Sequence, residues 1–243
     1  IMDNNTVDRG TREMLDKAQE GNIGTVFSRA DEQSKRCSFG TSGVCCRICY
    51  MGPCRITKKN PRGVCGADAD TIVARNLLRE AAAGTAAHSD HGRHVVQILR
   101  KVANGETDNY EIRDEDKLRR VARFFGIEPE DRDTLDVAGA LADRLMDEFT
   151  AQEETLTTPT LAPEQRYAVW QKTGVLPNGI DRMIVEAMHR THMGVDHDYR
   201  NLLLHAFRTS LTDGWGGSRI ATMVSDILFG TPTPVRSTSN LGV

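Results

Sequence analysis

Outside residues 37–65 the chain contains no cysteine, and several other features are also missing along its 243 residues. No apolar run approaches the roughly 18 residues of a membrane-spanning helix, which excludes a typical transmembrane segment. Basic and acidic side chains number 31 and 34. This balance gives a formal net charge of −3 and argues against general nucleic-acid binding, which needs a basic surface. No internal repeat, low-complexity segment or convincing strand pattern is visible.

The N-terminal residues 1–19 are polar and charged, so they do not form the apolar core of a secretory signal peptide. We therefore expect a cytoplasmic protein. Thiols stay reduced in that compartment, which makes clustered cysteines more typical of metal ligands than of disulfides.

The spacing of apolar residues predicts a mainly α fold, because most segments repeat at i, i+3 and i+4 between Gly or Pro residues. One predicted helix starts at an Asp70 cap, and a separate apolar stretch follows over residues 95–102. The other predicted helices cover residues 11–27, 114–126, 134–149, 163–172, 181–193, 199–211 and 218–228. Residues 214–217 are expected to form a glycine-rich turn, and they lack the lysine of a phosphate-binding loop.

These patterns divide the chain into an N-terminal helical segment (1–36), a cysteine-rich loop (37–66), a helical domain (67–230) and a connector (231–243). The connector begins with a proline-rich stretch and ends on apolar residues, as if a strand were starting. We expect it to lead into a further domain of a longer polypeptide.

The six cysteines follow the pattern C-x7-CC-x2-C-x4-C-x10-C. Cys46, Cys49, Cys54 and Cys65 give one C-x2-C pair with two further ligands, and four thiolates suit a [4Fe–4S] cube. Structural zinc is an alternative, although zinc ribbons normally pair two short cysteine knuckles and this chain has one. Disulfides are the second alternative.

Cys45 and Cys46 are adjacent, so their side chains tend to diverge and are not expected to bind the same cube. Cys45 then has only Cys37 as a companion, and two thiolates cannot complete a four-ligand cluster. A two-fold dimer would supply four ligands on its axis. The shared centre would be a [4Fe–4S] cube or, alternatively, a [2Fe–2S] cluster. Free thiols or a disulfide at Cys37 and Cys45 stay open.

Four segments of the chain, residues 37–55, 63–67, 86–94 and 226–232, resemble the N-terminal part of the anaerobic nickel-iron-sulfur carbon monoxide dehydrogenases. The cysteine segment CSFGTSGVCCRICYMGPCR is the most specific, and the resemblance covers nearly the whole chain. The related hybrid-cluster proteins also begin with C-x2-C, but they lack the Cys45–Cys46 doublet.

The resemblance implies an oxidoreductase that converts CO and water to CO2, two protons and two electrons, reversibly. It implies a helical N-terminal domain followed by two α/β Rossmann-like domains, which hold the catalytic nickel-iron-sulfur cluster, so no ligand of that cluster is in this chain. Cys46, Cys49, Cys54 and Cys65 match the ligands of the cube within one subunit, and Cys37 and Cys45 match those of the cluster shared by a homodimer. A ferredoxin-type electron carrier and an acetyl-CoA synthase are the implied partners.

His88, His91 and His94 are spaced at i, i+3 and i+6, which places them along one slowly drifting stripe of a helix. Imidazole titrates near neutral pH and can pass protons. The family resemblance implies a proton relay here, and a solvated helix face is the alternative. His189 and His192 lie near a predicted helix C-terminus, where interaction with the helix dipole explains them.

Arg47 and Arg55 flank predicted cluster ligands and would offset negative charge or guide an acidic electron partner; simple surface exposure is the alternative. Trp170 and Trp215 are expected in the core or in an interface. The prediction is thus an electron-relay and dimerisation part of a carbon monoxide dehydrogenase. The alternatives are a ferredoxin-like electron carrier and a zinc-stabilised helical interaction domain.

Overall fold

The computed structural model describes residues 6–33 and 35–233, and it confirms a mainly helical fold with a short cysteine-bearing loop near the N-terminus. The helices are, in chain order, α1 (Arg9–Glu20), α2 (Val26–Glu32), α3 (Ser38–Thr41), α4 (Ala69–Ala103), α5 (Glu115–Phe124), α6 (Thr134–Thr150), α7 (Glu164–Thr173), α8 (Ile180–Arg190), α9 (Tyr199–Thr212) and α10 (Ser218–Phe229). The shorter elements are strands β1 (Cys45–Cys46) and β2 (Cys54–Arg55), a 3₁₀ turn η2 (Thr158–Leu161) and a π-helical segment η3 (Asp213–Gly217). Within the described residues, no helix combines the length and the apolar character needed to cross a membrane.

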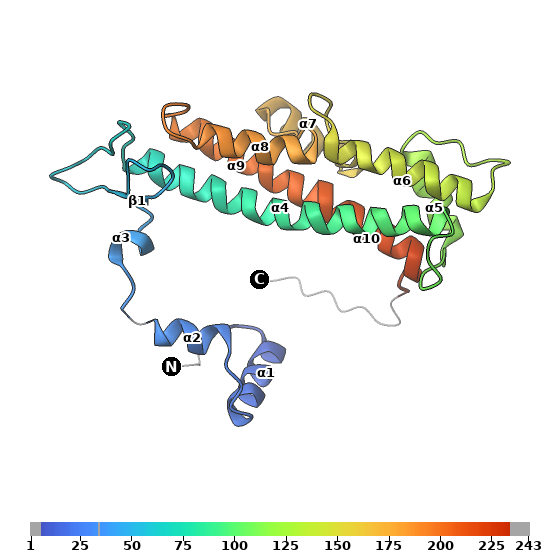
Figure 1. The fold of residues 1–243 in the computed structure, drawn as a ribbon, viewed down its shortest axis with the longest axis horizontal. Helices are drawn as coiled ribbons and strands as arrows, with labels where there is room; N and C mark the ends of the chain where they lie inside the picture. The colour runs from blue at the N-terminus through green and yellow to red at the C-terminus, as the bar shows by residue number, and fades with distance from the viewer. Residues whose placement is uncertain (1–5, 34, 234–243) are drawn as a thin grey trace.

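Helix α4 runs along the whole helical body, with the cysteine loop at its N-terminal end (Figure 1). It is one helix of 35 residues, so the prediction of two separate stretches was wrong. No proline interrupts residues 69–103, and the alanine-rich middle favours helix, so the two stretches join. The cap is Asp68, whose carboxylate accepts a hydrogen bond from the Thr71 N–H (3.0 Å); the predicted cap, Asp70, lies in the first turn.

Most other helices begin and end near their predicted limits. Asp114 caps α5 as predicted, because its carboxylate accepts a hydrogen bond from the Lys117 N–H (2.8 Å). Helix α8 ends at Arg190 and not at Met193, since the backbone turns before Gly194, which has a φ of +78°. The predicted domain boundaries stay a prediction.

Three groups of buried side chains follow one another along α4. At its N-terminus, Ile72 packs with Cys46 of the cysteine loop and with Ala67, which directly follows the loop. In the next section, small residues of α4 meet α8 and α9, where alanines such as Ala74 and Ala187 let the helices approach closely. The largest group joins the C-terminal half of α4 to α5, α6 and α10, and Leu99 is fully buried within it.

Residues 214–217, expected to form a glycine-rich turn, are helical. They belong to η3, a π-helical segment that joins α9 directly to α10. Glycine is required here by the approach of α4. A Cβ on Gly217 would lie 2.6 Å from the His88 carbonyl oxygen, and one on Gly92 would lie 2.7 Å from the Gly217 carbonyl oxygen. The two backbones therefore touch, and this contact brings Asp213 beside His88.

The N-terminal segment holds two helices where one was predicted over residues 11–27. Helix α1 ends before Gly21, and the chain reverses at Asn22, which has a φ of +50°. Helix α2 begins after Thr25 with a capping box closed by Ser28. Neither helix buries a side chain, and both lie away from the helical body in Figure 1. The strand expected at the C-terminal end falls within residues 234–243, outside the described residues.

The contact between α4 and η3 gives a stability test. The substitution Gly217→Ala should lower the free energy of unfolding by about 1–3 kcal/mol, the usual cost of overpacking. The reason is that a Cβ there meets the α4 backbone, which cannot move aside. Urea denaturation of the purified variant measures the change.

Gly214→Ala is the matched control in the same segment, because a Cβ on Gly214 meets nothing within 4 Å. That variant should be unchanged or more stable by up to about 1 kcal/mol, since alanine favours helix over glycine. Equal stability of the two variants would contradict the close contact.

Candidate metal-cluster site and histidine row

Four of the six cysteines, Cys46, Cys49, Cys54 and Cys65, line one cavity between the cysteine loop and the N-terminus of α4. The remaining residues around this cavity are Ile48, Gly52, Gly63, Ala67, Ile72, Arg75 and Met193. Met193 belongs to the loop between α8 and α9, so segments far apart in the sequence close the cavity together. These four are the cysteines that the sequence assigned to one cube.

A short antiparallel pair of strands, which the sequence analysis did not predict, organises this loop. Strand β1 pairs with β2 so that Cys46 lies opposite Cys54 and Cys45 opposite Arg55. Two residues are too few to show an alternating pattern, which is why the strands were missed. Successive side chains of a strand point to opposite faces. In agreement, Cys46 lines the cavity and Cys45 does not.

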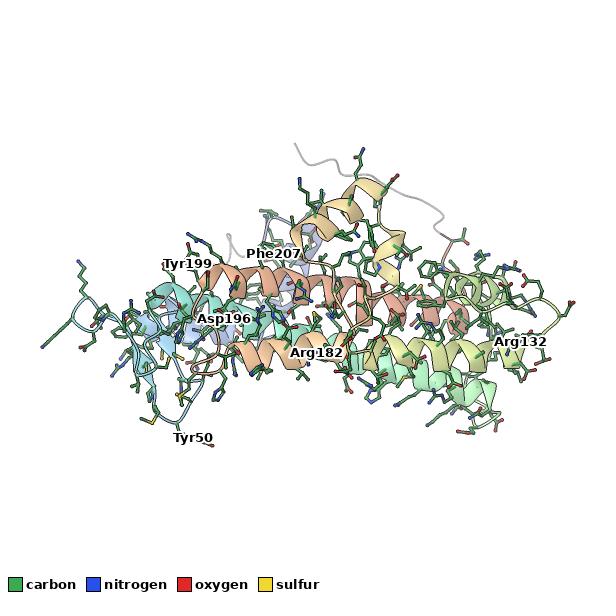
Figure 2. All side chains as sticks on the ribbon, turned by 90° about the horizontal axis from the view of Figure 1, so that it is seen from above. Tyr50, Arg132, Arg182, Asp196, Tyr199 and Phe207 are labelled. Atoms are coloured by element: carbon green, nitrogen blue, oxygen red, sulfur yellow. The ribbon has the colours of Figure 1, made fainter. Side chains whose placement is uncertain are left out.

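Helix α4 holds the cysteine doublet in place. The Asn76 side-chain amide donates hydrogen bonds to the carbonyl oxygens of Gly43 (3.0 Å) and Cys45 (3.1 Å). Glycine is needed at position 52, because a Cβ there would lie 3.1 Å from both the Cys46 carbonyl oxygen and the Cys54 nitrogen. A larger residue would therefore crowd both strands. At the tip of the loop, Tyr50 is fully exposed and projects away from the body (Figure 2).

The thiols of the cavity differ in their electrostatic surroundings. Burial raises the pKa of the Cys46 thiol. Burial also acts to raise the pKa of Cys65, but the Ala67 N–H and the Arg75 guanidinium outweigh it and leave that pKa below the ordinary thiol value. The Val64 N–H lies 3.5 Å from the Cys54 sulfur as a further donor.

Arg75 is the residue of this site that the sequence analysis missed. It is 1% exposed, and its Nη1 lies 3.6 Å from the Cys65 sulfur. Its Nη2 donates to the Asp196 carbonyl oxygen (2.8 Å) in the α8–α9 loop, which lies at the same end of the body as the cysteine loop (Figure 2). By contrast, Arg47 and Arg55 are exposed, and Arg55 lies over the ring of Phe39 at 5.4 Å.

The donor set fits a four-iron cube, because four thiols surround one cavity. A four-iron cube takes one thiolate on each iron and so spreads its ligands around a larger body.

Cys37 and Cys45 lie outside the cavity. Cys37 is exposed and directly precedes α3, and the N–H groups of Gly40 and Phe39 lower the pKa of its thiol. Cys45 is half-buried. Four of the six cysteines thus line the cavity and two do not; their assignment to two different clusters stays a prediction.

All three histidines of the predicted row are exposed on α4. The Nδ1 of His88 lies 2.7 Å from the Asp213 carboxylate of η3, and Nδ1 of His94 lies 3.8 Å from the Asp90 carboxylate. No local sequence pattern points to Asp213, because it lies far along the chain and reaches His88 only through the α4–η3 contact.

The other side chains singled out from the sequence have local roles. His189 lies in the last turn of α8, whereas His192 lies beyond it and lines an open hollow with Cys49 and Tyr50. Trp170 and Trp215 meet edge to face, with ring centroids 5.6 Å apart.

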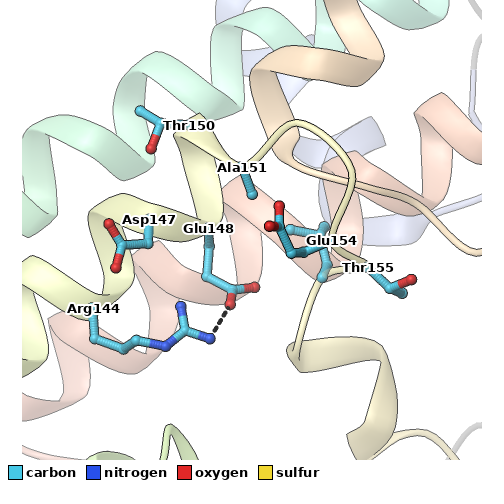
Figure 3. Close-up of a pocket in the computed structure, with 8 residues that line it drawn as sticks. Arg144, Asp147, Glu148, Thr150, Ala151, Glu154 and Thr155 are labelled. Atoms are coloured by element: carbon cyan, nitrogen blue, oxygen red, sulfur yellow. Dashed lines mark ion pairs between the residues drawn. The ribbon is translucent and has the colours of Figure 1, made fainter.

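A separate polar hollow lies at the C-terminal end of α6 (Figure 3). Glu148 in it is 4% exposed and pairs with Arg144 at 2.8 Å. It also accepts hydrogen bonds from the N–H (2.8 Å) and the hydroxyl (2.6 Å) of Thr157. Its charge is thus already satisfied within the chain.

Comparison with known proteins identifies the class. Residues 44–243 match the Prismane/CO dehydrogenase family, and the chain belongs to that family. The resemblance to carbon monoxide dehydrogenases noted from the cysteine segment is therefore confirmed.

Particular relatives agree with this class. The chain is 51% identical over 241 residues to carbon monoxide dehydrogenase 1 of Methanosarcina acetivorans, which covers 98% of this chain and 38% of that protein. The nickel-free crystal structure of carbon monoxide dehydrogenase from Thermococcus sp. AM4 superposes with a TM-score of 0.85 at 52% identity, covering 95% of this chain and 37% of that one.

A structure of acetyl-CoA synthase/carbon monoxide dehydrogenase, described for the NiZn[Fe4S4] and NiNi[Fe4S4] clusters of its alpha subunits, gives a TM-score of 0.84 at 39% identity. It covers 95% of this chain and 35% of that chain. The chain thus spans well under half the length of the relatives it matches.

The unequal surroundings of the thiols predict unequal reactivity. In iron-free protein kept reduced, Cys37 should be alkylated by iodoacetamide fastest at neutral pH and Cys46 slowest. The thiolate is the reacting form. Because the pKa of Cys37 is lowered, its alkylation rate should reach a plateau at a lower pH than that of an ordinary thiol. Because the pKa of Cys46 is raised, its alkylation rate should reach a plateau only at a higher pH. Peptide mass spectrometry after a short pulse measures both rates.

The control is the same pulse in concentrated urea, where the two rates should converge because burial and local hydrogen bonds are lost. Cys46 reacting as fast as Cys37 in the folded protein would contradict the burial seen here.

Proposed function

We propose that this chain is the electron-relay and dimerisation part of a nickel-dependent carbon monoxide dehydrogenase. The full enzyme would oxidise CO with water to CO2, two protons and two electrons, and would run the reverse reaction. The observation that carries the proposal is the cavity lined by Cys46, Cys49, Cys54 and Cys65, in a chain that belongs to the Prismane/CO dehydrogenase family.

The four cavity cysteines would hold a [4Fe–4S] cube, which supplies one-electron transfer when bound. The chain's own contribution is to prepare the site. The β1–β2 pair and Asn76 position the loop, and Ile72 and Ala67 exclude water from one side. The Ala67 and Val64 N–H groups donate toward ligand sulfurs, which is a common means of adjusting a cluster.

Cys37 and Cys45 would pair with the same residues of a second copy, so that one further cluster lies on the two-fold axis. Their separation from the cavity supports this assignment. A cluster shared near exposed Cys37 suits transfer to an external ferredoxin-type acceptor. Acetyl-CoA synthase is a candidate partner, because one matched structure is of a complex with that enzyme. The catalytic nickel-iron-sulfur centre would be held by later domains of the enzyme.

The histidine row would carry protons away from CO oxidation. Asp213 accepts from Nδ1 of His88, which fixes the ring so that Nε2 is free to take a proton. His91 and His94 follow along the exposed side of α4.

The proposal as a whole is tested on the full-length protein that contains this chain. We expect iron and nickel, visible absorption that bleaches with dithionite, and CO-dependent reduction of a viologen dye. A ferredoxin-like carrier would show the absorption without nickel or CO activity. A zinc-stabilised interaction domain would show neither iron nor bleaching.

Iron counting on variants of the full-length protein tests the two cysteine groups. Cys49→Ala should remove the cube from each subunit, and therefore about eight irons per dimer, because the cavity has no spare thiol. The double variant Cys37→Ala, Cys45→Ala should remove about four irons per dimer and leave the cavity cubes in place.

A loss of about two irons in the double variant would indicate a shared [2Fe–2S] centre. Unchanged iron in the double variant would refute the shared cluster, and unchanged iron in Cys49→Ala would refute the cavity cube. Each variant serves as the control for the other.

The His88–Asp213 pair gives a kinetic test. Asp213→Asn should lower the CO oxidation rate by about tenfold or more, because the ring of His88 loses its orienting carboxylate. For comparison, acid–base groups typically contribute about 10²–10⁴-fold to a rate. Iron and nickel content should not change.

Asp90→Asn is the matched control, since that exposed carboxylate lies 3.8 Å from Nδ1 of His94 and is too far for a hydrogen bond. Equal rates in the two variants, under conditions where proton release limits the wild type, would count against a role for Asp213.

A further inference from the structure

Arg75 is a buried cation at the wall of the four-cysteine cavity. It projects from the second turn of α4 and is 1% exposed. Its two hydrogen bonds go to the Cys65 sulfur (3.6 Å) and to the Asp196 carbonyl oxygen (2.8 Å), and neither acceptor is a carboxylate. A buried charge is costly unless an opposite charge compensates it.

One donor of Arg75 is also left without an acceptor. Its Nε is buried and has no hydrogen-bond partner within the described residues. Leaving a buried donor unsatisfied is energetically unfavourable, and more so for a charged group, so such donors are rare in proteins. The residue lines the cavity, and an anionic occupant there would supply the compensating charge.

A purely structural role explains less of this arrangement. The α8–α9 loop is fastened to α4 at two other points: Arg79 Nε donates to the Thr191 hydroxyl (2.8 Å), and the Thr71 hydroxyl donates to the His197 carbonyl oxygen (3.0 Å). Of these two donors Arg79 is also a cation and interacts electrostatically with the Cys46 thiol, but it is only half-buried and does not line the cavity, as Arg75 does. The exposed Arg47 and Arg55 have their charges screened by solvent, so Arg75 is better placed to act on the cavity.

We propose that Arg75 sets the reduction potential of the cluster held in this cavity. The inference rests on the proposed function, in which Cys46, Cys49, Cys54 and Cys65 bind a [4Fe–4S] cube. Such a cube carries net negative charge with its four thiolates, and one-electron reduction adds a further negative charge without making or breaking a bond. A fixed positive charge beside the cavity stabilises the reduced form more than the oxidised form. Charge and hydrogen bonds to sulfur are known determinants of cluster potential.

The test is a redox titration of the full-length protein, followed by EPR on the signal that Cys49→Ala removes. Arg75→Gln deletes the charge and should shift the midpoint potential of that cluster to more negative values. Arg75→Lys keeps the charge but cannot present the same N–H groups, so it should shift the potential in the same direction by less. Iron content is measured on each variant.

Arg100→Gln is the matched control. Arg100 lies on the same helix, also has a buried Nε without a partner, and pairs with Asp143. It is about 37 Å farther along α4 at 1.5 Å per residue, so its loss should leave the midpoint potential unchanged.

An iron-replete Arg75→Gln protein with the wild-type midpoint potential would overturn the proposal. If Arg75→Gln does not retain the cluster, Arg75→Met, which also deletes the charge, decides, and a wild-type potential in that iron-replete variant would likewise overturn it. A shift of the same size in Arg100→Gln would show a general charge effect and would also overturn it. Wild-type protein without an iron–sulfur signal would instead refute the proposed function, and the role of Arg75 with it.

Discussion

Burial of the side chains along α4 holds the described structure together, because each of the three buried groups includes residues of this helix. Its C-terminal half, with Val96 and Leu99, forms the main core with α5, α6 and α10. Its middle section meets α8 and α9 through small residues, where alanines permit close helix approach. Its first turns present Ile72 to the cysteine loop, which has few apolar side chains of its own. A continuous helix of 35 residues thus fixes the positions of the core, the histidine row and the cysteine cavity relative to one another.

The cysteine loop depends on α4 in a different way from the helical body. Its regular structure is a pair of two-residue strands, which would not be stable alone. Hydrogen bonds from Asn76 and the packing of Ile72 hold one side of the loop, and the thiols face the enclosed space. Metal binding supplies folding energy to such loops. Arg75, the charged residue of the cavity lining, would contribute to the redox chemistry of the proposed site.

Local features explain which parts of the fold could be predicted. Helix α5 follows from the Asp114 cap and Gly126, and α6 from its apolar repeat, because both patterns act within a few residues. The sequence pattern did not predict that the two halves of α4 form one helix. The middle of α4 is only weakly apolar, and it is covered by α8, α9 and η3, contacts that no local pattern reveals. One feature of the sequence does point to Arg75. It lies on the same apolar helix face as Ile72 and Leu78, where an arginine is unusual.

The sequence by itself determined the family and the helical class, since these follow from residue type and spacing. It also predicts a division of the six cysteines into four and two, from the divergence of adjacent side chains. Only the tertiary structure decided which distant groups meet them. Arg75 reaches Cys65 because the cysteine loop folds back on α4, and Asp213 reaches His88 because Gly92 and Gly217 let two helix backbones touch. Contacts of this kind depend on how helices approach in space, and no local pattern along the chain encodes that approach.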